Sequence, residues 1–234
     1  YTVGRVFREA DVPDAATVVI QSVSGTVNAG DRLAQEFLVG DGARARIRSQ
    51  GAVAVHRAND GVGSHEGTRL VVASGGVIEN LTEPRLLFPG ADYSQQAVLD
   101  VAGGGVAIHV EAFIDSGNRY SAPRSREAGS YASQTRILRD GVLLAQEVSR
   151  ATLPLPGEHP AHALVILAAA DVDVAALDAA WSEWHDRMGT PRLYGAASAL
   201  PFDAGVSVRI AAADGRLLRE AVASCVAVLR TVIR

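Results

Sequence analysis

The chain has 234 residues, of which 48% are hydrophobic and 21% charged, and its formal net charge is −4. This composition is that of a globular protein and excludes a disordered chain, and the acidic balance argues against a nucleic-acid partner. The sequence contains no run of 18 apolar residues, so no membrane span is expected. Cys225 is the single cysteine, which rules out an intrachain disulfide and favours a reducing, cytoplasmic location.

Short β-branched runs predict strands from residue 17 to about 170. They are separated by Gly, Asp, Asn and Ser and span 17–25, 44–57, 68–80, 96–113 and 134–150. Asp140-Gly141 lies between two such runs and predicts a tight hairpin. Three prolines in 151–160 indicate a loop that crosses the molecule within one domain.

Three segments of this region repeat one pattern, namely 39–47, 72–80 and 101–109. Each begins with Val, continues through small residues and Gly, and ends in an alternating strand. Glycine permits the positive φ or the close backbone approach that a sharp corner needs. A repeated corner predicts stacked β layers, as in a β-helical or solenoid-like body, although a sandwich with Gly-rich turns would produce a similar pattern.

Helices are expected only near the C-terminus. In 173–188 the apolar residues recur at helical spacing, Asp173 is placed as the N-cap, and Gly189 ends the segment. A second helix is expected after a strand at 205–210, with an apolar stripe over 217–229 and Asp214 near its start. Cys225 belongs to that stripe and is expected to be buried and inert. The fold class is therefore mainly β, with two α-helices.

No motif of a known catalytic class is present: G-x-S-x-G, C-x-x-C, H-E-x-x-H and a P-loop are all missing. His65 and Glu66 are expected in a polar, Gly-rich loop, where an imidazole and a carboxylate would suit nickel or zinc; a solvated pair is the alternative. His159 and His162 have ligand-like spacing, but Pro160 between them favours a turn.

Two carboxylates follow Gly-rich corners inside apolar strands, Glu79 and Glu111. Strand alternation directs Glu79 to the face opposite Ile78. A buried carboxylate needs a partner, so these residues indicate either ion pairs with arginine or a water-lined passage. A glycosidase would also use two acids, but its groove would carry aromatic residues, which make up only 5% of this chain.

Four segments resemble the urease accessory protein family UreD, also called UreH, in order and spacing. They are 24–33, 39–57, 75–96 and 192–210, of which 75–96 contains the specific run Leu-Phe-Pro-Gly-Ala. The matching motif positions are Gly30, Asp31, Gln50, Ala52, Glu79, Glu83, Pro84, Leu87, Phe88, Pro89, Gly90 and Ala91. The likeness covers 17–234 and predicts a single UreD-like domain over 1–234, with the residues before 17 less certain. Departures occur at Thr26, Ala29, His56 and 113–123.

The resemblance implies a β-helical body with two helices and a non-enzymatic maturation chaperone that docks on apo-urease. It also implies recruitment of UreF and, through UreF, of the GTPase UreG, and it allows a homodimer within the complex. No tightly bound cofactor is implied, only nickel in transit through an internal passage. Glu79, Glu83, Asp60 and Glu111 are the candidates to line that route. Phe88 is expected to fill the body beneath the Pro-Gly corner.

Two alternatives remain from the residues alone. One is a small β-solenoid enzyme that acts on carbohydrate through paired carboxylates. The other is a generic β-scaffold that binds proteins and has no role with nickel.

Overall fold

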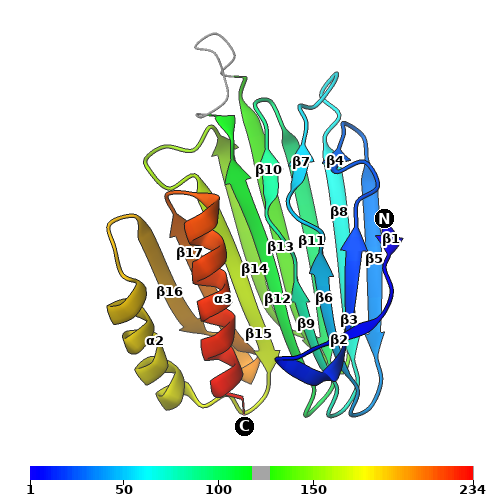
Figure 1. Ribbon diagram of the computed structural model, residues 1–234, viewed down its shortest axis with the longest axis vertical. Helices are drawn as coiled ribbons and strands as arrows, with labels where there is room; N and C mark the ends of the chain where they lie inside the picture. Colours follow the sequence, from blue (N-terminus) through cyan, green and yellow to red (C-terminus); the bar gives the residue numbers. More distant parts are fainter. Residues whose placement is uncertain (118–126, 234) are drawn as a thin grey trace.

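The computed structural model describes residues 1–117 and 127–233, and it confirms a mainly β architecture with two helices near the C-terminus (Figure 1). Over these residues, twelve strands form a large sheet: β1 (Thr2–Val3), β2 (Phe7–Glu9), β3 (Val12–Gln21), β4 (Thr26–Val27), β6 (Arg44–Ser49), β7 (Val53–Val55), β9 (Val77–Leu81), β10 (Arg85–Leu87), β12 (Val106–Asp115), β15 (Ala161–Ala169), β16 (Leu193–Ala199) and β17 (Gly205–Ala212). Five strands form a small sheet: β5 (Arg32–Val39), β8 (Ser64–Val72), β11 (Asp92–Val101), β13 (Gly129–Arg139) and β14 (Val142–Leu153). The departure expected at 113–123 lies partly outside the described residues.

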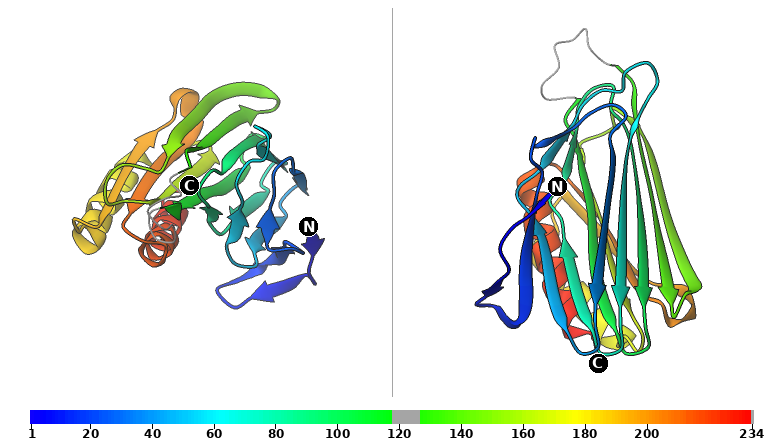
Figure 2. Two further views of the ribbon diagram at one scale, coloured as in Figure 1. Left: turned by 90° about the horizontal axis from the view of Figure 1, so that it is seen from above. Right: turned by 90° about the vertical axis from the view of Figure 1, so that its right-hand side faces the viewer.

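The two sheets stack as the faces of a solenoid, because the chain passes from the small to the large sheet at three similar corners (Figure 2). These corners join β5 to β6, β8 to β9 and β11 to β12, and each strand pairs in parallel with its counterpart in the next coil. Gly42, Gly75 and Gly104 take φ values of 64°, 67° and 76° at these corners. The repeated sequence pattern is therefore a solenoid corner, as one of the two alternatives predicted.

The coil ends in antiparallel pairing. Asp140 and Gly141 both have positive φ, 50° and 78°, and join β13 to β14 in the predicted hairpin. The chain then crosses from the small to the large sheet over 154–160, so the expected crossing loop is present but shorter than 151–160, because β14 continues to Leu153. There β15 pairs antiparallel with both β12 and β17.

Helices α2 (Val174–Met188) and α3 (Gly215–Thr231) cover one part of the outer face of the large sheet (Figure 1). The predicted N-cap of α2 is confirmed, because the Asp173 side chain accepts a hydrogen bond from the Ala176 N–H. Asp214, expected near the start of α3, is the N-cap of that helix and accepts a hydrogen bond from the Leu217 N–H. Neither helix among the described residues is long and apolar enough to cross a membrane.

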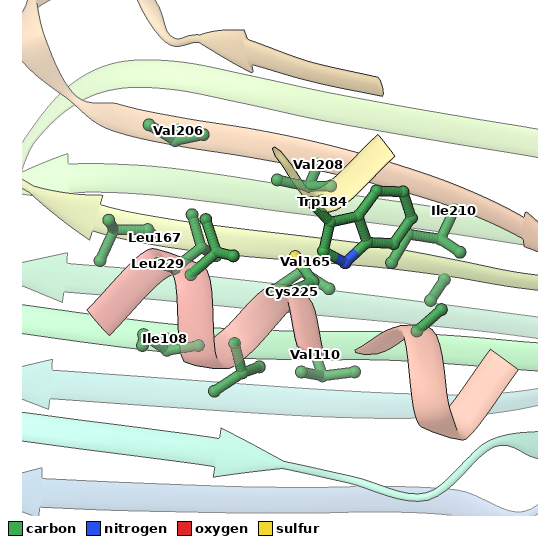
Figure 3. Close-up of a cluster of buried hydrophobic side chains, with 14 of the residues drawn as sticks. Ile108, Val110, Val165, Leu167, Trp184, Val206, Val208, Ile210, Cys225 and Leu229 are labelled. Carbon is green, nitrogen blue, oxygen red and sulfur yellow. The ribbon is translucent and has the colours of Figure 1, made fainter. Parts of the chain in front are cut away.

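The helices pack on the sheet through a buried apolar cluster. Figure 3 labels ten of its members: Ile108, Val110, Val165, Leu167, Trp184, Val206, Val208, Ile210, Cys225 and Leu229. Burial raises the pKa of the Cys225 thiol to about 12, so the thiol stays protonated and inert, as expected.

Candidate functional site

The space between the two sheets is apolar at both ends and polar in the middle. One end holds a cluster that includes Leu70, Ile78 and Leu99, and the other holds a cluster that includes Leu87 and Phe113. Between them lies what we call the polar layer, formed by the inward side chains of Gln35, Glu66, Thr68, Asn80, Arg85, Gln95, His109, Glu111, Ser133 and Thr135. Polar groups in such a place need partners or water, because burial removes their hydration.

Strand alternation on β12 places two members of this layer. Successive side chains of a strand point to opposite faces, so Ile108 and Val110 pack under the helices while His109 and Glu111 point toward the small sheet. Both polar residues are at least nine-tenths buried.

One part of the layer is a closed ion pair. Arg85 Nη2 donates to Glu66 Oε1 at 2.7 Å and Arg85 Nε donates to Oε2 at 3.0 Å, while the Tyr93 and Tyr1 hydroxyls donate to the same carboxylate. Burial disfavours the charged carboxyl, but the Arg85 guanidinium and these hydroxyls outweigh it and hold the pKa of Glu66 below its ordinary value. Glu66 and Arg85 thus neutralise each other.

The other carboxylate of the layer is less satisfied. Glu111 Oε1 accepts a hydrogen bond from Thr135 Oγ1 at 2.5 Å and lies 3.4 Å from His109 Nε2. Asn80 Nδ2 lies 3.0 Å from His109 Nδ1; donation there leaves the ring proton on Nε2, facing Glu111. Burial raises the pKa of Glu111, but His109 and Thr135 outweigh it and keep the carboxyl ionised.

Glu111 Oε2 is the unusual atom of this group. It is buried and accepts no hydrogen bond from the described residues, although Gln95 approaches the carboxylate and helps to lower its pKa. No arginine or lysine among the described residues forms a salt bridge with Glu111. Its basic neighbour is the His109 imidazole, whose Nε2 lies 3.4 Å from Oε1, so this carboxylate depends on a histidine where Glu66 has an arginine.

This carboxylate lies between two spaces. A cavity of about 20 Å³, room for about one water molecule, is lined by Glu66, Arg85, His109 and Glu111 among others. Glu111 also lines an open cleft of about 370 Å³, whose walls include residues of β12, β13, β14, β15, β16 and β17. It is the residue that the cavity and the cleft share.

The same cavity meets the outer face of the large sheet at the break between β9 and β10. Thr82 and Glu83 line both the cavity and an outer groove of about 550 Å³ between α3 and the β2–β3 hairpin. The Glu83 N–H donates to Ser49 Oγ at 2.7 Å, whereas Glu83 Oε2 accepts no hydrogen bond from the described residues and lies 3.9 Å from Arg219 Nη1. Groove, cavity and cleft therefore adjoin through Glu83 and Glu111.

Two of the predicted route residues do not face this layer. Glu79 points outward from β9, where Arg46 Nε donates to its Oε2 at 2.7 Å and Arg230 Nε donates to its Oε1 at 2.6 Å. The ion-pair alternative is thus correct for Glu79, and it faces away from Ile78 as predicted. Asp60 is exposed, in a turn closed by the Asn59–Val62 bridge, and does not line the polar layer.

The two histidine-containing segments, at 65–66 and 159–162, have different outcomes in the structure. His65 and Glu66 lie in strand β8 and not in a loop, so their side chains occupy opposite faces and cannot share one ion. His65 Nδ1 instead lies 3.1 Å from Ser94 Oγ. At the other pair, His162 Nε2 lies 2.8 Å from the His159 carbonyl oxygen, which supports the expected turn. Over the described residues, no group of three or more His, Cys, Asp or Glu is arranged to hold a metal ion.

The Leu-Phe-Pro-Gly-Ala motif forms a corner, as expected, but a different residue fills the body. Gly90 has φ 74°, and the Ala91 N–H donates to the Phe88 carbonyl oxygen at 2.9 Å. Leu87 and Ala91 are fully buried, whereas Phe88 is only half-buried and stacks on His56 with ring centroids 5.6 Å apart. Leu87 on β10 points inward. Because successive side chains of an extended chain point to opposite sides, the next residue, Phe88, points away from the body.

The earlier motif residues shape turns and lie away from the polar layer. The Asn28 N–H donates to Asp31 Oδ2 at 2.8 Å, and Gly30 between them has φ 79°. Gln50 and Ala52 are exposed, and the Gln50 N–H donates to the Ile20 carbonyl oxygen. These four motif residues therefore belong to the turns that connect the strands between β4 and β7.

Several members of the layer were not predicted from the sequence, above all Arg85, Asn80 and Gln95. Asn80 was detectable, because it occupies the same position in the second repeated segment as His109 does in the third, and the two pair in register. Arg85 and Gln95 fall outside the repeated segments, so the repeat gave no sign of them.

Comparison with known proteins gives the family. The family model described as UreD urease accessory protein matches residues 1–234. The chain belongs to the UreD family. It is 32% identical to urease accessory protein UreD 2 of Bradyrhizobium sp. strain BTAi1, over 94% of this chain and 77% of that protein. It is 31% identical to UreD of Mycolicibacterium smegmatis, over 94% and 78%, and 30% identical to UreD of Haloarcula marismortui, over 85% and 67%. UreD membership supports a role in urease maturation.

Proposed function

We propose that this UreD family member is a non-enzymatic scaffold that docks on apo-urease with UreF and, through UreF, with UreG, and that its polar layer carries Ni²⁺ toward the urease active site. The observation that carries the proposal is the buried, ionised Glu111, whose Oε2 is unpartnered between an inner cavity and an open cleft. The cytoplasmic location expected from the sequence is part of this proposal.

The route runs from the outer groove past Glu83, through the small cavity, past Glu111 and into the cleft. Carboxylate oxygens, an amide oxygen and an imidazole follow one another along it, and Ni²⁺ accepts each of these ligand types. The cavity has room for about one water molecule, so a hydrated ion must exchange water for side-chain ligands there.

The charge of the layer favours transit over storage. Glu66 is engaged by Arg85, which leaves Glu111 to attract the cation while the Arg85 guanidinium repels it from the Glu66 side. A single carboxylate with one neighbouring imidazole binds a divalent ion weakly, because a tight site needs three or four protein ligands. Weak binding lets the ion move on.

The alternatives find less support. The paired-carboxylate enzyme was based on acids such as Glu79 and Glu111, which lie on opposite faces of the large sheet and cannot face one groove. If the protein is a scaffold that has no role with nickel, the buried Glu111 Oε2, which accepts no hydrogen bond from the described residues, remains unexplained.

The test is Glu111→Gln in cells that express the urease operon, with Asp60→Asn as the matched control. Glutamine keeps the shape but removes the charge, so urease activity is expected to fall while size exclusion still shows the complex with UreF. Asp60 is exposed and away from the layer, so Asp60→Asn should leave activity unchanged. Full urease activity with Glu111→Gln would remove nickel transit from the proposal, and separate elution of wild type and UreF would remove the scaffold itself.

A further inference from the structure

Three large apolar side chains are exposed at the end of the small sheet where β13 turns into β14. Val142 and Leu143 at the start of β14 are 63% and 54% exposed, and Phe202 in the short helical turn η1 (Pro201–Asp203) is 78% exposed. The η1 turn packs against β14, and the Arg139 guanidinium donates a hydrogen bond to the Asp203 carbonyl oxygen. In Figure 2 this orange turn lies beside the end of the small sheet. Val142 and Leu143 are consecutive in β14 and point to opposite faces, so only Val142 shares the face of Phe202; we call Phe202 and Val142 the apolar tip.

Phe202 is exposed on a turn whose backbone conformation is energetically unfavourable. Phe202 and Asp203 both have φ 54°, a left-handed conformation that non-glycine residues rarely adopt and that surrounding structure must enforce. Leu200 and Ala204 on either side are buried, and the Leu200 N–H donates to the Gly205 carbonyl oxygen at 2.8 Å. An exposed phenyl ring gains nothing from this strain within the chain itself.

Carboxylates border the apolar tip. Asp140, Asp171 and Asp203 are all exposed, and the Asp171 N–H donates to Asp203 Oδ2, which ties two of them together. Arg139 donates to the Asp203 carbonyl oxygen and keeps its positive charge, so three carboxylates are offset by one guanidinium. The rim is therefore acidic around an apolar centre, which is the usual anatomy of a small docking surface.

We propose that the apolar tip anchors a protein partner whose surface offers an apolar pocket bordered by lysine or arginine side chains. The proposal rests on the proposed function, since the partner is another component of the urease maturation assembly. A second copy of this chain fits less well, because a two-fold contact would bring two acidic rims together. Phe202 enters the pocket, and Val142 excludes water beside it, because Val142 pairs with Arg139, whose guanidinium reaches the η1 turn. Leu143, the next residue of β14, points to the opposite face.

The test measures both stability and binding for Phe202→Gly, with Asp60→Gly as the matched control. Asp60 also has a left-handed φ, 51°, in an exposed turn of the solenoid far along the chain from the tip. Glycine relieves the strain in both variants, so both should melt at or above the wild-type temperature. Only Phe202→Gly should weaken binding to the immobilised apo-urease–UreF–UreG assembly, by about tenfold or more. Asp171→Asn should weaken it more at low than at high salt.

Four results would overturn the proposal. Wild-type binding by Phe202→Gly would show that the ring is not an anchor. A lower melting temperature for Phe202→Gly alone would make Phe202 structural. A concentration-dependent homodimer that this variant abolishes would identify a second copy as the occupant. A wild-type chain that joins no urease component would overturn the proposed function together with this inference, whereas the first three results leave that function standing.

Discussion

Replacing Glu66 by glutamine should destabilise the fold far more than an ordinary surface change. The side chain keeps its shape but loses its charge, which leaves the Arg85 guanidinium buried between the sheets without a counter-ion. Breaking a buried pair by removing one partner costs about 3–5 kcal/mol of unfolding free energy. The control is Glu36→Gln, which breaks a half-exposed pair with Arg69 on the neighbouring strands and should cost about 0–1 kcal/mol.

Urea unfolding monitored by tryptophan fluorescence measures both variants, because Trp184 is buried under the helices. The pKa of Glu66 is lowered in the folded chain, so its stabilisation is present at neutral pH and is lost as the pH falls below the ordinary carboxyl range of about 4. The gap between wild type and Glu66→Gln should therefore shrink toward acid pH. Equal losses for Glu66→Gln and Glu36→Gln, or a gap independent of pH, would refute this reasoning.

Three further outcomes are expected. Gly205→Ala should lower the free energy of unfolding by about 3–5 kcal/mol, because Gly205 has φ 123° and an added Cβ would collide with the Leu167 carbonyl oxygen. The control is Gly103→Ala, whose Cβ would meet no atom, so the same urea titration should show almost no change. Cys225 should resist a thiol reagent at pH 8 until urea unfolds the chain, and rapid labelling of the folded protein would contradict its burial. Asp214→Ala should cost about 1 kcal/mol by circular dichroism melting, since the α3 N-cap is lost; an unchanged melt would contradict this capping role.

Much of the fold follows from sequence patterns that report short-range physics. The Gly-rich corners, the Asp140-Gly141 hairpin and the Asp173 cap need only local backbone geometry, and the sequence predicts each of them. The repeated segments also determine contacts between neighbouring coils. Arg46 and Glu79 hold equivalent positions, as do Asn80 and His109, and each pair lies side by side in register. Stacking coils brings equivalent positions together, so the repeat predicts these contacts in principle.

The rest depends on how the two sheets face each other, which no local pattern reports. Glu66 comes from the small sheet and Arg85 from the large sheet, so their contact depends on the stagger between the sheets. Asp60 is acidic and close in sequence to a motif strand, but its turn leaves the side chain exposed. The motif predicts Phe88 inside the body, but strand alternation directs the preceding residue, Leu87, inward instead.

Nickel transfer in vitro tests the central claim most directly. Purified complexes that contain wild type, Glu111→Gln or Asp60→Asn are incubated with Ni²⁺ and apo-urease, and the nickel bound to urease is measured over time by mass spectrometry. Wild type and Asp60→Asn should load urease at the same rate, and Glu111→Gln should load it much more slowly although its complex is intact. Equal loading by all three complexes would contradict a route past Glu111.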